Sequence, residues 1–120
     1  MYKDNIEKQT EDNVNFRHVL ATGPHLQLVV MALKPGEEIG LETHEDTDQF
    51  FRIEVGEATF IINGEEHTAG DGDAVIVPAG KEHNVINKGD VPLKLYTIYA
   101  PPHHPEGTVH KTKEEADAAE

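Results

Sequence analysis

The chain has 120 residues and a net charge of −13, from 10 Lys and Arg against 23 Asp and Glu. This length predicts one domain with a single hydrophobic core. Because so negative a chain repels a polyphosphate backbone and an anionic lipid surface, we expect neither nucleic acid nor membrane as a partner. The sequence has no cysteine. Any bound metal would therefore be held by His nitrogen and by carboxylate or amide oxygen.

The first residues, 1–13, are polar and charged with little apolar periodicity. They predict a flexible N-terminal arm. They contain neither a basic start followed by an apolar core nor a membrane-spanning run, so we expect a soluble, cytoplasmic protein.

The segment from His25 to Leu33 is apolar on both alternating faces. Such a pattern predicts a strand covered on two sides, either by sandwich packing or by a partner subunit. Since C₂ dimers are the commonest way to cover such a surface, we expect a homodimer.

Further strands follow at short intervals. Residues 48–55 alternate clearly, and Gln49, Phe51, Ile53 and Val55 share the side predicted to face inward. Asn63-Gly64 lies between two strand-like segments, 57–62 and 65–69, and predicts a hairpin with a type I′ turn. Three more strands are expected at 74–77, 83–87 and 93–100. Short strands separated by Gly and Pro turns predict an all-β sandwich or barrel over residues 14–100.

After Pro101-Pro102 the chain is expected to leave the sheet and to form a C-terminal extension, residues 101–120. Thr112 with Glu115 three residues later predicts the capped start of one short helix that ends near Ala119.

Two segments carry residues with metal-ligand chemistry. The first is GEEIGLETHEDTDQFFRIEVG, residues 36–56, and the second is GDAVIVPAGKEHNVIN, residues 72–87. On an extended chain Glu42 and His44 point to one face, and Gln49 reaches that face from the next strand. His83 follows a Pro-x-Gly turn, and barrels bring such strand starts together at one mouth.

Together the two segments resemble the signature motifs of the cupin superfamily. Eight of the ten positions that these motifs usually fix match: Gly36, His44, Gly56, Gly72, Pro78, Gly80, His83 and Asn87. Glu42 stands where the family's first histidine usually sits, and Gln49 where its glutamate usually sits. The resemblance covers roughly residues 26–100 and implies a jelly-roll barrel, the double-stranded β-helix. Within the family the chain is similar to the small single-domain cupins described as mannose-6-phosphate isomerase-like.

The predicted metal ligands are Glu42, His44, Gln49 and His83. One anionic oxygen, two neutral imidazoles and one weak amide oxygen suit a divalent transition metal such as Zn, Fe, Mn, Co or Ni. Type I mannose-6-phosphate isomerases, which are cupins, bind zinc with the same inventory and the Gln and Glu positions exchanged. That similarity implies zinc as a candidate and does not imply an isomerase. A weak donor at Gln49 would leave open coordination, or Gln49 would contact a substrate instead.

Several nearby residues have simpler interpretations. Glu42 could be one more solvated acid in an acidic segment, and Glu45, Asp46 and Asp48 are expected to form a solvated turn. His103 and His104 point apart on an extended chain, so we expect them in solvent rather than at the site.

Three other residues are assigned by strand parity or by the motif. Tyr99, rather than Tyr96, is expected to face the pocket. Asn87 is expected to fix a turn or a strand pairing through hydrogen bonds, and Arg52 is expected on the outside of the barrel.

Two classes of function fit these features. The first is a metal-dependent enzyme, such as an oxygenase or an isomerase, and the second is a non-catalytic module that binds a small polar metabolite or a sugar. A sugar-phosphate isomerase-like enzyme is less favoured, because the basic residues near the motifs are chiefly Lys81 and Arg52. The sequence assigns no catalytic residue and no organic cofactor.

Overall fold

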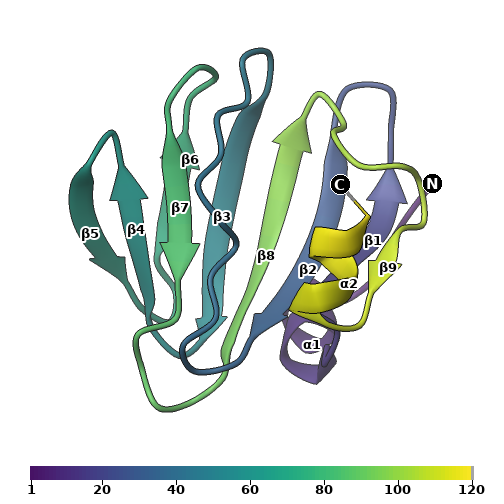
Figure 1. Ribbon diagram of the computed structural model, residues 1–120. Helices are drawn as coiled ribbons and strands as arrows, with labels where there is room; N and C mark the ends of the chain where they lie inside the picture. Colours follow the sequence, from purple (N-terminus) through teal and green to yellow (C-terminus); the bar gives the residue numbers. More distant parts are fainter. Residues whose placement is uncertain (120) are drawn as a thin grey trace.

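In the computed structural model, which describes residues 1–119, nine strands form two antiparallel sheets that face each other (Figure 1). The larger sheet has the order β6-β3-β8-β2-β1-β9 and the smaller one β5-β4-β7. The strands of the larger sheet are β1 (Arg17–Thr22), β2 (Gln27–Leu33), β3 (Asp48–Val55), β6 (Ala74–Val77), β8 (Leu93–Ala100) and β9 (Val109–His110). Those of the smaller sheet are β4 (Ala58–Ile62), β5 (Glu65–Ala69) and β7 (His83–Ile86). The predicted all-β jelly-roll is confirmed.

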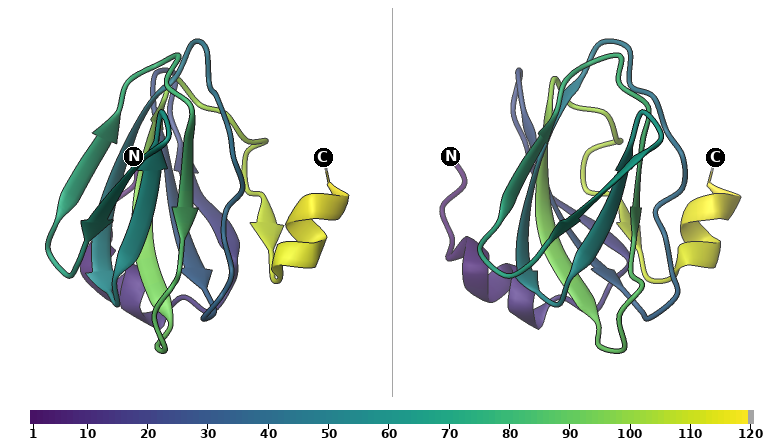
Figure 2. Two further views of the ribbon diagram at one scale, coloured as in Figure 1. Left: turned by 60° about the vertical axis from the view of Figure 1, so that its left-hand side comes forward. Right: turned by 90° about the vertical axis from the view of Figure 1, so that its left-hand side faces the viewer.

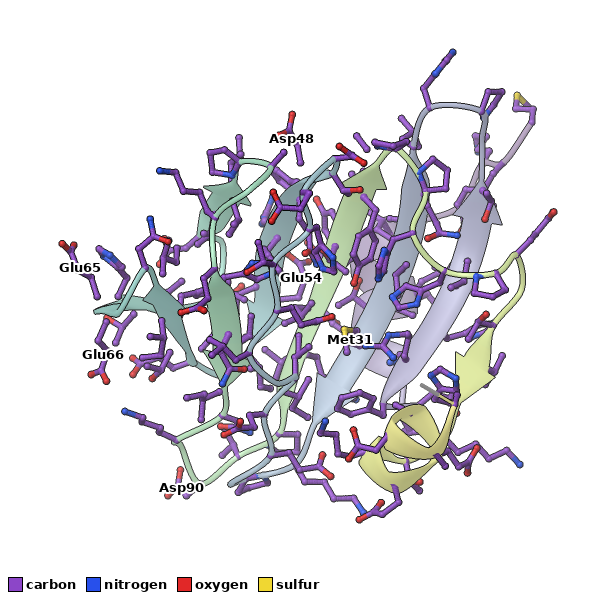
Figure 3. The ribbon with its side chains drawn as sticks, turned by 45° about the horizontal axis from the view of Figure 1, so that its top comes forward. Met31, Asp48, Glu54, Glu65, Glu66 and Asp90 are labelled. Carbon is purple, nitrogen blue, oxygen red and sulfur yellow. The ribbon has the colours of Figure 1, made fainter. Side chains whose placement is uncertain are left out.

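The core lies between the two sheets, because alternate side chains of each strand point to that side. Phe51 on β3 packs edge-to-face against Phe60 on β4, with ring centroids 5.1 Å apart. Met31 on β2 lies in the same layer, as Figure 3 shows. Gln49 and Ile53 are buried on the inner face of β3, as predicted. Val55, which was expected there too, is only partly buried.

The hairpin between β4 and β5 has the predicted turn. Asn63 and Gly64 both have positive φ, 49° and 81°, as a type I′ turn requires. The turn sets the register of Ile62 opposite Glu65. Glu65 and Glu66 therefore lie at the outer edge of the smaller sheet, away from the core (Figure 3).

The expectation of a flexible N-terminal arm is wrong for residues 6–12. They form helix α1 (Ile6–Asp12), which begins after Asn5, whose side chain accepts a hydrogen bond from the Lys8 amide. The helix packs on the outer face of the larger sheet, where Lys94 donates to the Glu11 carbonyl at 2.6 Å (Figure 2). Tertiary contact stabilises so short a helix, which its own sequence periodicity does not reveal.

Helix α1 also changes the interpretation of β2. Val30, on the outer face of that strand, is 1% exposed and lines the same cleft as Gln9 and Asp12 of α1. Helix α1 therefore covers part of the outer face of β2, and only the rest of that face is available to a partner subunit.

The C-terminal extension folds back over the barrel instead of leaving it (Figure 1). Its strand β9 pairs with β1, a strand that the sequence analysis did not predict. Helix α2 (Lys113–Ala118) follows and begins as predicted, since the Thr112 side chain accepts from the Glu115 amide at 3.1 Å. Ala116 of α2 is buried in the core, and Lys113 donates to the Ile39 carbonyl. The extension thus covers inner surface of β1 and β2 that the narrower sheet leaves open.

No helix among residues 1–119 is both long enough and apolar enough to cross a bilayer.

Gly56 is a position where the fold tolerates no side chain. A Cβ there would lie 2.7 Å from the Pro92 carbonyl oxygen, and φ is +84°. Gly72 has the same positive φ, +85°, but a Cβ there would meet nothing within 4 Å. We expect Gly56→Ala to lower the free energy of unfolding by about 2 to 4 kcal/mol and Gly72→Ala by about 1 kcal/mol. Urea unfolding of the two variants measures the difference, and equal losses would contradict the steric argument.

Candidate functional site

The two motif segments meet through backbone hydrogen bonds at one end of the barrel. Glu42 and His83 exchange both of their backbone bonds, N to O at 2.8 and 2.9 Å, as an isolated antiparallel bridge. The Ile39 amide donates to Val85 and the Gly36 amide to Asn87. The segment before β3 therefore runs antiparallel to β7, so ligand candidates 41 residues apart in sequence become neighbours.

Asn87 has the structural role predicted for it. Its buried amide nitrogen donates to the carbonyls of Leu33 and Val91, and its side-chain oxygen accepts from the Gly89 amide. These bonds fix the turn after β7 at the end of the barrel opposite the candidate site. Figure 3 shows the two ends, marked by Asp48 near the site and Asp90 far from it.

His44 is the most deeply buried of the candidate ligands on the loop. Its carbonyl accepts from the Gly80 amide at 2.8 Å, which ties the loop to the turn before β7. Its side chain is 8% exposed, and its Nε2 is buried without a hydrogen-bond partner, 3.7 Å from Glu42 Oε2. Burial, with smaller effects from His103, His83 and Arg17, lowers the pKa of His44 to about 4. The imidazole is therefore neutral at pH 7, which is the form that binds a metal.

His83 and Gln49 face each other across the inner surface of the barrel. The Nδ1 of His83 donates to the Lys81 carbonyl at 3.0 Å, which leaves the lone pair on Nε2. The amide nitrogen of Gln49 donates to Thr97 Oγ1 at 3.0 Å, so that its Oε1 lies 3.2 Å from that Nε2. The two atoms are within hydrogen-bond distance, and whether Nε2 donates to Oε1 depends on the tautomer of the ring. Both are atoms of the kind that bind metals, and both lie on the inner surface of the barrel.

The structure also brings His103 to the site. Its side chain is exposed, as expected, but the expectation that it lies apart from the site is wrong. Its ring centroid is 4.3 Å from that of His44, and its ring stacks on Tyr99 at 5.4 Å. Glu42, His44 and His103 each offer a ligand atom, and these atoms lie within 4.8 Å of one another. His103 is thus a further candidate ligand beside the four predicted residues.

Buried Gln27 explains why the segment after β8 folds over the site. Its Oε1 accepts from the backbone amides of both His103 and His104, at 3.1 and 2.9 Å, and its Nε2 donates to the His104 carbonyl. In the sequence, the sign of this contact is a polar residue, Gln27, at the start of an otherwise apolar strand. The structure shows that this side chain is completely buried.

Tyr99 faces inward as predicted, and it is 1% exposed. Its hydroxyl lies 3.3 Å from His104 Nε2, and burial raises its pKa. His104 is also partly buried rather than exposed, and burial together with the nearby Arg17 charge lowers its pKa to about 3. The phenol is therefore protonated and the imidazole neutral at pH 7.

The remaining residues near the motifs lie outside the site, as expected. Glu45, Asp46 and Asp48 are exposed, and Asp48 accepts from the Ala79 amide. Arg52 lies on the outer face of β3 and pairs with Glu54 at 3.1 Å.

The donors present fit a divalent transition metal. The unpartnered Nε2 of His44 is an atom that such an ion would satisfy, and the Nε2 of His83 and the Oε1 of Gln49 lie on the same inner surface, 3.2 Å apart. Glu42 adds a carboxylate beside them. Imidazole nitrogens with carboxylate and amide oxygens are typical ligands of Zn, Fe, Mn, Co and Ni.

Comparison with known proteins agrees with the fold and the motifs. Residues 29–99 match the family model of the cupin domain, and the chain belongs to this family. It is 51% identical over 122 aligned positions to the uncharacterized protein YrkC of Bacillus subtilis, covering 97% of this chain and 66% of that protein. The chain thus spans about two thirds of that relative's length.

Two further proteins are similar. The crystal structure of BH2720 from Bacillus halodurans superposes with a TM-score of 0.95 at 46% identity, over 98% of this chain and 93% of that one. An oxalate-binding protein of Thermotoga maritima is 31% identical over 57% of this chain and 56% of its own length.

The buried histidines make stability depend on pH. The folded-state pKa values of His44 and His104, about 4 and about 3, lie below the ordinary value of 6.5, so between these values the unfolded chain binds more protons. We expect the free energy of unfolding of the metal-free protein to fall from pH 7 to pH 5, and to fall less in His104→Gln. Urea unfolding in EDTA at pH 7, 6 and 5 measures both slopes; identical slopes would exclude His104 as a contributor.

Proposed function

We propose that this chain is a divalent-metal-binding cupin that binds a small polar metabolite at an open position of its metal site. The observation that carries the proposal is the buried Nε2 of His44, which has no hydrogen-bond partner although Glu42 and the rings of His83 and His103 surround it. Leaving a buried acceptor unsatisfied costs free energy, which a bound metal would recover.

Each residue would have a distinct part in holding the metal. His44 and His83 would supply the two strongest donors, because both present a lone pair toward the site. Glu42 would supply the anionic oxygen, and Gln49, fixed by Thr97, a weak neutral one. The bound ion would act as a Lewis acid toward a ligand oxygen. With one weak donor in the set, a position remains open for that ligand.

The metabolite class is proposed from size and from one relative. The cavity beside Glu42 and His103 has a volume of about 190 Å³, which suits a small molecule. The Thermotoga maritima relative is named as an oxalate-binding protein, and it supports a binding role for a compact polar compound. The finer resemblance to mannose-6-phosphate isomerase-like cupins stays a prediction.

A metal-dependent enzyme, an oxygenase or an isomerase, is the second candidate. It is favoured by the pairing of the Tyr99 hydroxyl with neutral His104, beside His44. Burial raises the pKa of Tyr99 and so keeps the phenol protonated, and the hydroxyl can donate a hydrogen bond to a bound ligand. Oxygen-uptake screening of the Fe(II)-loaded protein distinguishes an oxygenase from a binding module.

Metal content tests the proposal directly. After loading with zinc and dialysis, we expect His44→Ala and His83→Ala each to lose most of the metal measured by elemental analysis, because each removes one of two buried nitrogen donors. Gln49→Ala should lose less, and Gln49→Glu should bind more tightly through the added charge. His67→Ala, on exposed β5, is the matched control and should bind as the unaltered protein does. Unchanged metal in the double variant His44→Ala, His83→Ala would refute this site.

We further propose that the chain forms a homodimer through the outer face of the larger sheet. Four apolar side chains follow one another across neighbouring strands there, because Ile76 pairs with Phe50, Phe50 with Ile98, and Ile98 with Leu28. Ile76 is 66% exposed, and the other three are only partly covered. A contiguous apolar row of this kind is typical of a protein interface rather than of a free surface.

A charge in this row should separate the subunits. We expect sedimentation velocity to show a dimer at micromolar concentration, and Ile76→Glu to shift it to the 13.3 kDa monomer. Val91→Glu introduces the same charge at a 49% exposed position away from the row and serves as control. A monomeric unaltered protein would contradict the proposal.

A further inference from the structure

Arg17 is a buried cation that neither the motifs nor the sequence analysis singled out. It begins β1 on the inward face and is 7% exposed. No ion pair among residues 1–119 includes it, and its Nε is buried without a hydrogen-bond partner. Its one hydrogen-bond partner is His110, whose Nδ1 accepts from Nη1 at 3.2 Å. A buried charge without a counter-charge is costly, and such groups concentrate where ligands bind.

Arg17 lines a cavity that shares two residues with the candidate metal site. This cavity of about 190 Å³ lies between the barrel and the C-terminal extension, and its wall includes Arg17, Glu42, His103, His104 and His110. Glu42 and His103 belong to both the cavity and the candidate metal site. A molecule in the cavity would therefore contact Glu42 and His103 of the candidate metal site as well as Arg17.

On this basis we propose that Arg17 is the anion-recognition group of the site and that the ligand is a small dicarboxylate, one carboxylate on the metal and the other on Arg17. This inference rests on the proposed metal-binding function. Planar guanidinium pairs with carboxylate through two parallel hydrogen bonds, and the unpartnered Nε provides one of the two donors that such a pair needs.

Charge balance supports a dianion with separated charges. A divalent metal with the Glu42 carboxylate carries one net positive charge, and Arg17 adds a second. His110 adds none, because burial and the Arg17 charge lower its pKa. A phosphate concentrates its charge on one group and is usually held by several cations, whereas this cavity wall offers Arg17 as its single fixed cation among the described residues.

Calorimetric titration tests the proposal with defined probes. Oxalate, malonate and succinate would each be titrated into the zinc-loaded protein, beside their neutral diamides and inorganic phosphate. We expect at least one of the three acids to bind and its diamide not to. Arg17→Gln should weaken that binding about tenfold to a hundredfold, the loss typical of a hydrogen-bonded charge, and Arg17→Lys less, because it keeps the charge but loses the fork.

The matched control is Lys88→Gln. It removes the same charge from an exposed side chain after β7, where Lys88 pairs with Glu66 on the surface of the smaller sheet. It should leave the affinity unchanged. Thermal unfolding of Arg17→Gln checks that the variant is folded. If it is not folded, the affinity of Arg17→Lys for the acid tests the proposal instead.

Metal analysis of the same samples separates this inference from the proposed function. If Arg17→Gln retains zinc and no longer binds the acid, the metal site and the role of Arg17 are both supported. If the unaltered protein binds no metal but binds the acid in an Arg17-dependent way, the metal proposal fails and anion recognition stands. Binding of phosphate alone, of none of the three acids, or with equal affinity in Arg17→Gln would overturn the assignment of Arg17.

Discussion

The reciprocal backbone bridge between Glu42 and His83 is the contact on which the site depends. It joins a loop before β3 to the first residue of β7, and so it unites segments that belong to different sheets. Since the two bonds fix both backbones, the side chains of Glu42 and His83 are placed without any metal to draw them together. The Gly80 amide on the His44 carbonyl extends this arrangement by one more ligand. The site is therefore preorganised by main-chain bonds, which have no side-chain rotamer entropy to lose.

The second determinant of the site is how its polar atoms are buried. Thr97 and the Lys81 carbonyl orient Gln49 and His83, and each leaves one acceptor directed into the barrel. Burial keeps His44 and His104 neutral at pH 7 by lowering their pKa values. A strongly acidic chain thus encloses a cavity in whose wall, among residues 1–119, Arg17 is the one fixed positive charge. The net negative charge of the chain and the positive charge of Arg17 have opposite signs, and Arg17 is buried whereas most of the acidic side chains are exposed.

The C-terminal extension is part of the barrel, because it adds a strand to one sheet and a residue to the core. The smaller sheet has three strands against six. Strand β9 extends the larger sheet beside β1, and α2 contributes Ala116 to the core. Gln27 holds the start of the extension by three hydrogen bonds, and these place His103 beside His44. In the same way α1 covers part of the outer face, burying Val30. Both ends of the chain therefore contribute to the packing of one domain.

The sequence by itself determined the features that local patterns encode. Alternation placed Gln49, Phe51 and Ile53 inward, Asn63-Gly64 gave the hairpin turn, and motif spacing selected the four residues that the structure gathers at one end of the barrel. These follow because side-chain direction in a strand and the φ preferences of Asn and Gly are properties of a few adjacent residues.

Only the tertiary structure decided which distant residues complete the site. The buried side-chain amide of Gln27 holds His103 at the site. Arg17 is placed there by β1, a strand whose polar first residue gives no sign that it points inward. Helix α1 and the role of Val30 were likewise invisible, because a helix of two turns is stabilised by what it packs against. Contacts between residues 76 and 93 positions apart leave no periodic pattern in the sequence. The positions of the two chain ends could therefore be known only from the tertiary structure.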